Sequence, residues 1–138
     1  MKFEKSAGAV MFRFQNNERL FLLLRYSQGH WGFPKGHVEK NETELETLSR
    51  EIEEETKIKQ FDLNPKFRET IFYYFTNSGQ KVRKEVVFYL AETNKKEVSL
   101  SVEHIDFDWL SFEKAFEKLS FSNTKSLLKK AELFLNKN

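Results

Sequence analysis

The chain of 138 residues is long enough to bury a core but too short for two ordinary domains, so residues 1–138 are expected to form one domain. It has no cysteine, which excludes disulfides and cysteine-ligated zinc, and it has neither a signal peptide nor an apolar run of about 18 residues, so a cytoplasmic protein without a membrane partner is expected. The net charge of +2 hides an asymmetry, because residues 36–58 carry eight acidic and three basic side chains, a net −5 that leaves +7 elsewhere.

The predicted elements begin with two strands, at residues 6–14 and 20–26, joined by a polar turn. A loop at 27–35 precedes an acidic helix, for which Asn41 is the expected N-cap. The later elements are a hairpin of strands 67–75 and 84–91, a strand at 106–110, and helices at 112–119 and 124–135. Strands on both sides of one central helix, followed by a C-terminal helix, predict a mixed sheet covered on both faces.

The acidic helix carries its charges unevenly. At about 100° per residue Leu45, Leu48 and Ile52 share one apolar stripe. Three carboxylates, those of Glu51, Glu54 and Glu55, gather on an arc beside that stripe, whereas Glu46 and Glu53 point toward solvent. Like charges this close destabilise a helix, so a cation is expected there, and carboxylate oxygens suit Mg²⁺. The alternative is a solvated acidic face without a ligand.

The residues around that arc follow a fixed order: Gly36, Glu42, then Arg50-Glu51-Ile52-Glu53-Glu54-Glu55 and Ile58. This order resembles the Nudix box of the Nudix hydrolases. The resemblance implies an α+β chain with the Nudix fold, an α/β/α sandwich with a mixed β-sheet whose box, residues 36–58, forms a loop-helix-loop. One position departs from the box, since Lys57 stands where a glycine is usual; lysine there is expected to cost at most about 1 kcal/mol and to leave the chemistry intact.

The same resemblance implies a reaction. In Nudix hydrolases a divalent metal activates a water that attacks phosphorus, and Glu51, Glu54 and Glu55 match the metal ligands, here Mg²⁺ with Mn²⁺ as the alternative. Arg50 matches the arginine that orients one of these carboxylates; the plainer reading is a surface pair with Glu54. Glu103 is the candidate for a further acid from a later loop. The general base stays open among Glu54, Glu55 and Glu103.

Three segments, at residues 31–39, 84–91 and 103–110, resemble the asymmetric diadenosine tetraphosphate hydrolases within this family. The resemblance implies that Lys35 and His37 meet phosphate, that the Lys35 carbonyl lies near the metal, and that Lys84 points at the polyphosphate. Tyr73 stands where an aromatic side chain stacks on adenine. Plainer readings remain: Tyr73 and Tyr74 alternate faces, so either could be the inward one, and Lys84 could be an edge-strand charge.

The implied function is the Mg²⁺-dependent hydrolysis of dinucleoside polyphosphates, diadenosine tetraphosphate and water giving ATP and AMP. The alternatives are removal of pyrophosphate from RNA 5′ ends, hydrolysis of nucleoside triphosphates, and a non-catalytic nucleotide- or RNA-binding module. Lys35 and His37 argue against the RNA-end enzymes, which usually have glutamine and a second glycine there, and the complete set of box carboxylates argues against the module. A monomer with a nucleotide as its partner is expected, with an RNA 5′ end left open.

Overall fold

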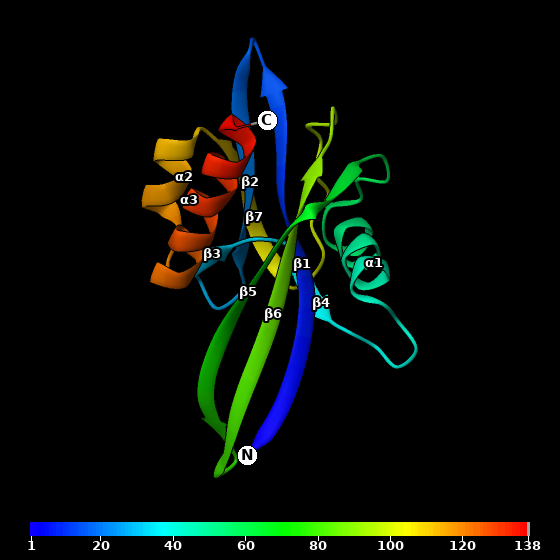
Figure 1. The fold of residues 1–138 in the computed structure, drawn as a ribbon, viewed down its shortest axis with the longest axis vertical. Helices are drawn as coiled ribbons and strands as arrows, with labels where there is room; N and C mark the ends of the chain where they lie inside the picture. Colours follow the sequence, from blue (N-terminus) through cyan, green and yellow to red (C-terminus); the bar gives the residue numbers. More distant parts are fainter. Residues whose placement is uncertain (138) are drawn as a thin grey trace.

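The computed structural model describes residues 1–137, and most elements lie where the sequence predicts them (Figure 1). The two hairpins are longer than predicted, and two short strands lie in and just after the predicted loop at 27–35. The elements are β1 (Lys2–Gln15), β2 (Glu18–Tyr26), β3 (Trp31–Gly32), β4 (Lys35–His37), α1 (Glu44–Thr56), β5 (Asp62–Asn77), β6 (Gln80–Glu92), β7 (His104–Leu110), α2 (Phe112–Lys118) and α3 (Ser122–Asn136).

The seven strands form one mixed sheet with the order β3-β2-β1-β6-β5, in which β4 also pairs with β1 and β7 with β2. Only the β1–β6 pairing is parallel among the pairings of the described residues; it runs from Lys2 opposite Val82 to Phe12 opposite Glu92. Every other pairing of the described strands is antiparallel. The predicted mixed sheet is therefore confirmed.

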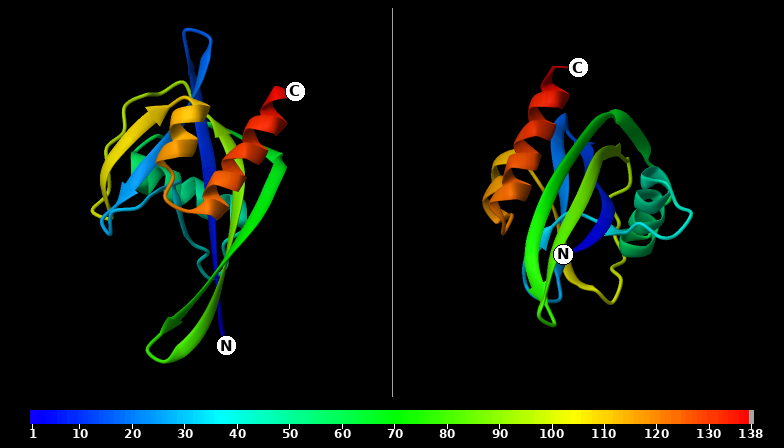
Figure 2. Two further views of the ribbon diagram at one scale, coloured as in Figure 1. Left: turned by 90° about the vertical axis from the view of Figure 1, so that its left-hand side faces the viewer. Right: turned by 60° about the horizontal axis from the view of Figure 1, so that its bottom comes forward.

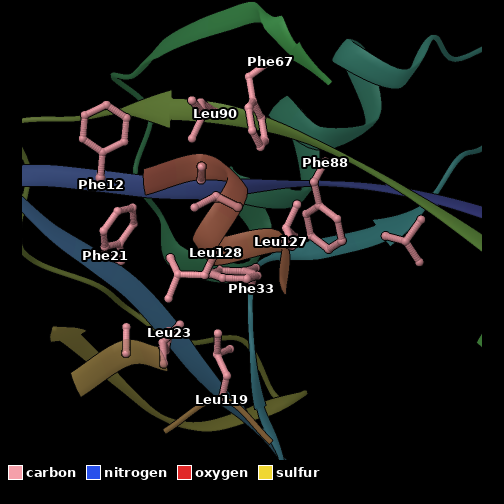
Figure 3. Packing of buried hydrophobic residues seen from close by; sticks show 14 residues of the cluster. Phe12, Phe21, Leu23, Phe33, Phe67, Phe88, Leu90, Leu119, Leu127 and Leu128 are labelled. Carbon is pink, nitrogen blue, oxygen red and sulfur yellow. The ribbon is translucent and has the colours of Figure 1, made fainter. Parts of the chain in front are cut away.

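Helices cover both faces of this sheet, with α1 on one side and α2 and α3 on the other (Figures 1 and 2). Because strand side chains alternate between faces, β1 feeds two separate cores. Ala9 and Met11 pack toward Leu48 and Ile52 of α1. The opposite core joins phenylalanines of the strands and of the link between β3 and β4 to leucines of α3, among them Phe12, Phe21, Phe33, Phe88, Leu127 and Leu128 (Figure 3).

Helix α1 begins at a different cap from the predicted one. Thr43, not Asn41, is the N-cap: its hydroxyl accepts from the Glu46 N–H, and the Glu46 carboxylate accepts from the Thr43 N–H. This reciprocal pair satisfies two amide groups that the first turn leaves free, which Asn41, two residues earlier, does not do. Leu45 also differs from the expectation, since it is 36% exposed while Leu48 and Ile52 are fully buried.

The far half of the β5–β6 hairpin and the start of β1 extend beyond the helices, at the end of the molecule where the N-terminus lies (Figures 1 and 2). Aromatic side chains on this extension are only partly covered, including Phe3, Phe72 and Tyr74. Of the helices described, none has both the length and the apolar character needed to cross a membrane.

Candidate active site

The loop before α1 runs directly against the carboxylates of that helix. The Lys35 N–H, in β4, donates to Glu55 Oε1 at 3.1 Å. The next residue, Gly36, leaves no room for a side chain, because a Cβ there would lie 1.9 Å from Glu51 Oε1. Gly8 of β1 lets β4 approach in the same way, since a Cβ would meet the Pro34 carbonyl oxygen at 2.4 Å. Two glycines thus bring the loop backbone onto the buried acids.

Arg50 joins the loop to the helix. Its guanidinium donates to both carboxylate oxygens of Glu42, at 2.7 and 3.0 Å, and to the carbonyl oxygen of His37 at 3.1 Å. It also reaches Glu54 at 3.4 Å and Glu51 at 3.6 Å. The bidentate bond to Arg50 lowers the pKa of Glu42 to about 2. The predicted pair with Glu54 is therefore present, but the shorter bonds of Arg50 hold the loop before α1. Glu42 belongs to the box, and its bonds to Arg50 are a role that the spacing of the box does not indicate.

The three arc carboxylates differ in environment. Glu54 is exposed, whereas Glu51 and Glu55 are buried, and each of these two has an Oε2 without a hydrogen-bond partner. Burial raises the pKa of Glu55 to about 8, with repulsion from Glu51 adding to it. Burial, followed by repulsion from Glu54, raises the pKa of Glu51 to about 7. Two buried oxygens without donors, held beside other acids, fit a divalent cation with oxygen ligands.

These carboxylates do not form a complete metal site by themselves. Among residues 1–137 no three or more side chains of His, Cys, Asp or Glu converge as a ready-made metal site. Glu103 is exposed in the segment before β7, which is tied to the loop after β2 by a bond from the Ser27 N–H to the Glu103 carbonyl oxygen at 3.0 Å. It faces the same hollow as Glu51.

We call this hollow, of about 370 Å³, the carboxylate hollow. The sequence-predicted residues that line it are Lys35, His37, Glu51, Lys84 and Glu103, and its other lining residues are Ser6, Tyr26, Ser27, Gln28 and Gly36. Glu54 and Glu55 are not among them: Glu55 lies behind Lys35, to which it is bonded, and Glu54 lies beside Arg50. No pattern in the sequence indicates that Tyr26, Ser27 or Gln28 lines this hollow.

A second hollow, of about 220 Å³, adjoins the first, and we call it the aromatic hollow. Tyr73 lines it, whereas Tyr74 is 67% exposed, so Tyr73 is the member of the pair that faces the site. Lys35 and Lys84 line both hollows. The remaining walls are His30, Trp31, Gly32, Phe33, Phe75, Phe88, Phe121 and Thr124. Phe121 comes from the junction of α2 and α3 and could not be predicted, because only tertiary packing brings it here.

The two shared lysines are unusual cations. Burial, helped by repulsion from Lys84, lowers the pKa of Lys35 to about 8, and burial lowers the pKa of Lys84 as well. Lys35 Nζ lies 5.3 Å from the ring centre of Tyr26, a ring that is stacked on His30 at 4.4 Å. Two desolvated ammonium groups between an acidic and an aromatic hollow are suited to an anionic group that links a metal to a flat ring.

Comparison with known proteins agrees with this geometry. Residues 2–130 match the model of the NUDIX domain. The bis(5′-nucleosyl)-tetraphosphatases [asymmetrical] of Mus musculus and Caenorhabditis elegans are each 35% identical to the chain, over 95% of this chain and 95% and 96% of their own lengths. A crystal structure of a C. elegans Ap4A hydrolase binary complex superposes with a TM-score of 0.88 at 35% identity, covering 98% of this chain and 99% of that one. The chain therefore belongs to the Nudix hydrolase family and is similar along its whole length to asymmetrical bis(5′-nucleosyl)-tetraphosphatases.

Proposed function

We propose that this protein hydrolyses dinucleoside polyphosphates, cutting diadenosine tetraphosphate asymmetrically to ATP and AMP. The single observation that carries the proposal is the pair of adjoining hollows that share Lys35 and Lys84, one lined by carboxylates and the other by aromatic rings. A dinucleoside polyphosphate needs aromatic rings for its base, cations for its phosphate chain, and carboxylates for the metal at the bond that is cut. The aromatic hollow, the two shared lysines and the carboxylate hollow lie in that order. The names of the 35% identical relatives support the same substrate class.

The metal in this proposal is Mg²⁺, with Mn²⁺ as the alternative. The side chains proposed to hold it are Glu51, Glu54, Glu55 and Glu103, together with the carbonyl oxygen of Lys35. The buried Oε2 atoms of Glu51 and Glu55, neither of which accepts a hydrogen bond, support this set. Bound Mg²⁺ neutralises phosphate oxygens and lowers the pKa of a water.

The residues of the chain divide the remaining work. A water oxygen forms a bond to one phosphorus, the bridging P–O bond breaks, and a carboxylate among Glu54, Glu55 and Glu103 takes the proton of the water. Arg50 holds Glu54 and Glu51 toward the loop. No covalent bond to the protein forms.

Substrate binding is assigned to the walls of the two hollows. Lys35, His37 and Lys84 are proposed to contact the phosphates, and Tyr73 to stack on one base, with Trp31 as a further aromatic wall. Stacking on a base contributes about 1 to 3 kcal/mol and tolerates any base. We also propose that residues 1–138 act as one domain, as a monomer and in the cytoplasm.

The experiment incubates purified protein with Mg²⁺ and diadenosine tetraphosphate and separates the nucleotide products by chromatography. Equal amounts of ATP and AMP, absent with Glu54→Gln, are expected. Glu53→Gln is the matched control, because Glu53 is an exposed neighbour on the same helix and should keep full activity. Two ADP would contradict asymmetric cleavage, full activity of folded Glu54→Gln would contradict the metal assignment, and turnover of triphosphorylated RNA alone would move the proposal to RNA ends.

A further inference from the structure

Trp31, a wall of the aromatic hollow, is held by a distant part of the chain. It lies in β3, whose two residues pair with Leu24 and Arg25 of β2. The Trp31 N–H donates to Ser120 Oγ at 2.9 Å, and the Ser120 N–H reaches the Trp31 carbonyl oxygen at 3.5 Å. Ser120 lies 89 residues later, between α2 and α3. The backbone of this wall is thus fixed by the helix junction as well as by the sheet.

The indole ring is held from the same direction. Lys118, the last residue of α2, places its Nζ 4.4 Å from the ring centre of Trp31. The Lys118 ammonium also lies 3.8 Å from Asp108 of β7, so the ion pair and the ring share one cation. Elsewhere the indole packs against the core that contains Phe33 and Phe88. A ring between a core and a cation has little freedom to turn.

We propose that Lys118 is a positioning residue that, with Ser120, fixes the indole of Trp31 as a rigid wall for the base of the substrate. This inference rests on the proposed function, because the wall matters only if a base enters the aromatic hollow. A wall that is already ordered costs less to organise when the ligand binds. Lys118 therefore acts on substrate binding and leaves the hydrolytic step unchanged.

The plainer reading is that Lys118 serves only its ion pair with Asp108. The two readings separate cleanly. Asp108→Asn removes the ion pair and leaves the ammonium over the indole, whereas Lys118→Gln removes both while keeping a side chain of similar length. Lys118→Arg keeps a cation that stacks on aromatic rings.

The first test needs no substrate. The chain has two tryptophans, so Trp109→Phe leaves Trp31 as the only indole, and acrylamide quenching then reports how tightly Trp31 is held. Lys118→Gln in that background is expected to raise the quenching constant, and Lys118→Arg and Asp108→Asn to leave it near the parent value. Lys114→Gln, on an exposed lysine of the same helix, is the matched control. Equal quenching in the parent and Lys118→Gln would overturn the proposal.

The second test measures steady-state hydrolysis of diadenosine tetraphosphate with the natural tryptophans. Lys118→Gln is expected to raise KM about two- to fivefold at unchanged kcat, the range of an exposed cation–π contact, and Lys118→Arg to restore it. A fall in kcat at unchanged KM would overturn the proposal, since it would place Lys118 in the chemical step. If the parent protein lacks this activity, the proposed function fails. The inference about Lys118 is then tested by the affinity for ATP, measured by Trp31 fluorescence in the Trp109→Phe background. Weaker binding by Lys118→Gln supports the inference, and equal binding overturns it.

Discussion

At the scale of single residues, the surroundings of Glu55 disfavour the ionised form of its carboxyl group. Its folded pKa of about 8 exceeds its ordinary value of 4.5, so between these pH values the folded protein binds more protons than the unfolded chain. The stability that this group contributes is therefore present in full below pH 4.5 and is lost as the pH rises through about 8. Above that pH the ionised carboxylate weakens the metal-free fold.

The corresponding prediction is that Glu55→Gln stabilises the metal-free protein at pH 8. Glutamine can still accept the Lys35 N–H, but it has no proton to lose. Melting temperatures measured in EDTA from pH 5 to pH 8 should fall less steeply in Glu55→Gln than in the parent, and Mg²⁺ should raise the melting temperature of the parent more. Parallel pH profiles would contradict the burial of a proton-binding carboxyl here. His30 and His104 have lowered pKa values, so their contributions to stability change with pH in the opposite direction. Both proteins contain these histidines, so their contributions cancel in the comparison.

Gly36 gives a second prediction at this scale. The three atoms nearest to a Cβ at Gly36 all belong to the end of the Glu51 side chain, which can rotate away, so Gly36→Ala should lower kcat by about 100-fold while moving the melting temperature little. Gly8→Ala is the contrasting variant, because its Cβ would meet backbone atoms of Pro34 and Lys35. It should destabilise the fold. Thermal unfolding and kinetics of both variants test this, and a Gly36→Ala enzyme with full kcat would contradict it.

At the scale of elements, α1 shows how far local sequence determines structure. Leu48 and Ile52 identify its buried stripe, and the run from Thr43 to Glu46 has the spacing of a capping box, so the true N-cap was readable even though Asn41 was the expected one. At its other end Lys57 adopts the left-handed conformation, φ 64°, as anticipated for the position where glycine is usual. Its Nζ donates to the Glu54 carbonyl oxygen.

Lys57→Gly is therefore predicted to stabilise the protein by up to about 1 kcal/mol, because glycine adopts a positive φ without steric cost. The gain is reduced by the lost Nζ bond and by the greater freedom of glycine in the unfolded chain. Urea titration measures the effect, and kcat should be unchanged, since Lys57 lines neither hollow. A loss of more than about 1 kcal/mol would show that the lysine bond outweighs the strain.

The strands and the site were less accessible from sequence than this helix. The hairpin of β5 and β6 could be predicted from its β-prone runs and the turn at Gly79, but β3 has only two residues and carries no periodicity. Lys35, Lys84, Tyr73 and Glu103 were identified by resemblance to a family. Their convergence depends on pairings between distant strands, and local patterns contain no information about those pairings.

At the scale of the whole molecule, one carboxylate joins helix α1 to three strands of the sheet. Glu44, at the start of α1, accepts from Arg68 of β5 at 2.8 and 3.0 Å and from the Tyr89 hydroxyl of β6 at 2.7 Å, and it pairs with Lys5 of β1 at 2.6 Å. The Arg68 bonds are the main reason that the pKa of Glu44 is lowered to about 2. This contribution to stability is present above the ordinary value of 4.5 and is lost as the pH falls through about 2.

Glu44→Gln should therefore lower the free energy of unfolding at pH 7 by about 1 kcal/mol, a value reduced for screening at the half-exposed Lys5 and Arg68. Below pH 2 the parent and the variant should converge. Urea titrations at pH 7 and at low pH measure this difference. Glu53→Gln is the control; Glu46→Gln is unsuitable, because the Glu46 carboxylate caps helix α1. An equal difference at both pH values would mean that packing, not charge, links the layers.

The parallel pairing of β1 with β6 also has a consequence for how the chain acquires its fold. The eleven pairs from Lys2–Val82 to Phe12–Glu92 each close a loop of about 80 residues, so the central partnership of the sheet is among its least local contacts. On the ribosome, β1 emerges first and can pair with β2 at once, but its other edge stays open until residue 92 has been made. The strand that feeds both cores thus keeps one edge unpaired while about 80 further residues are made, and refolding of residues 1–138 should be slow for a chain of this size.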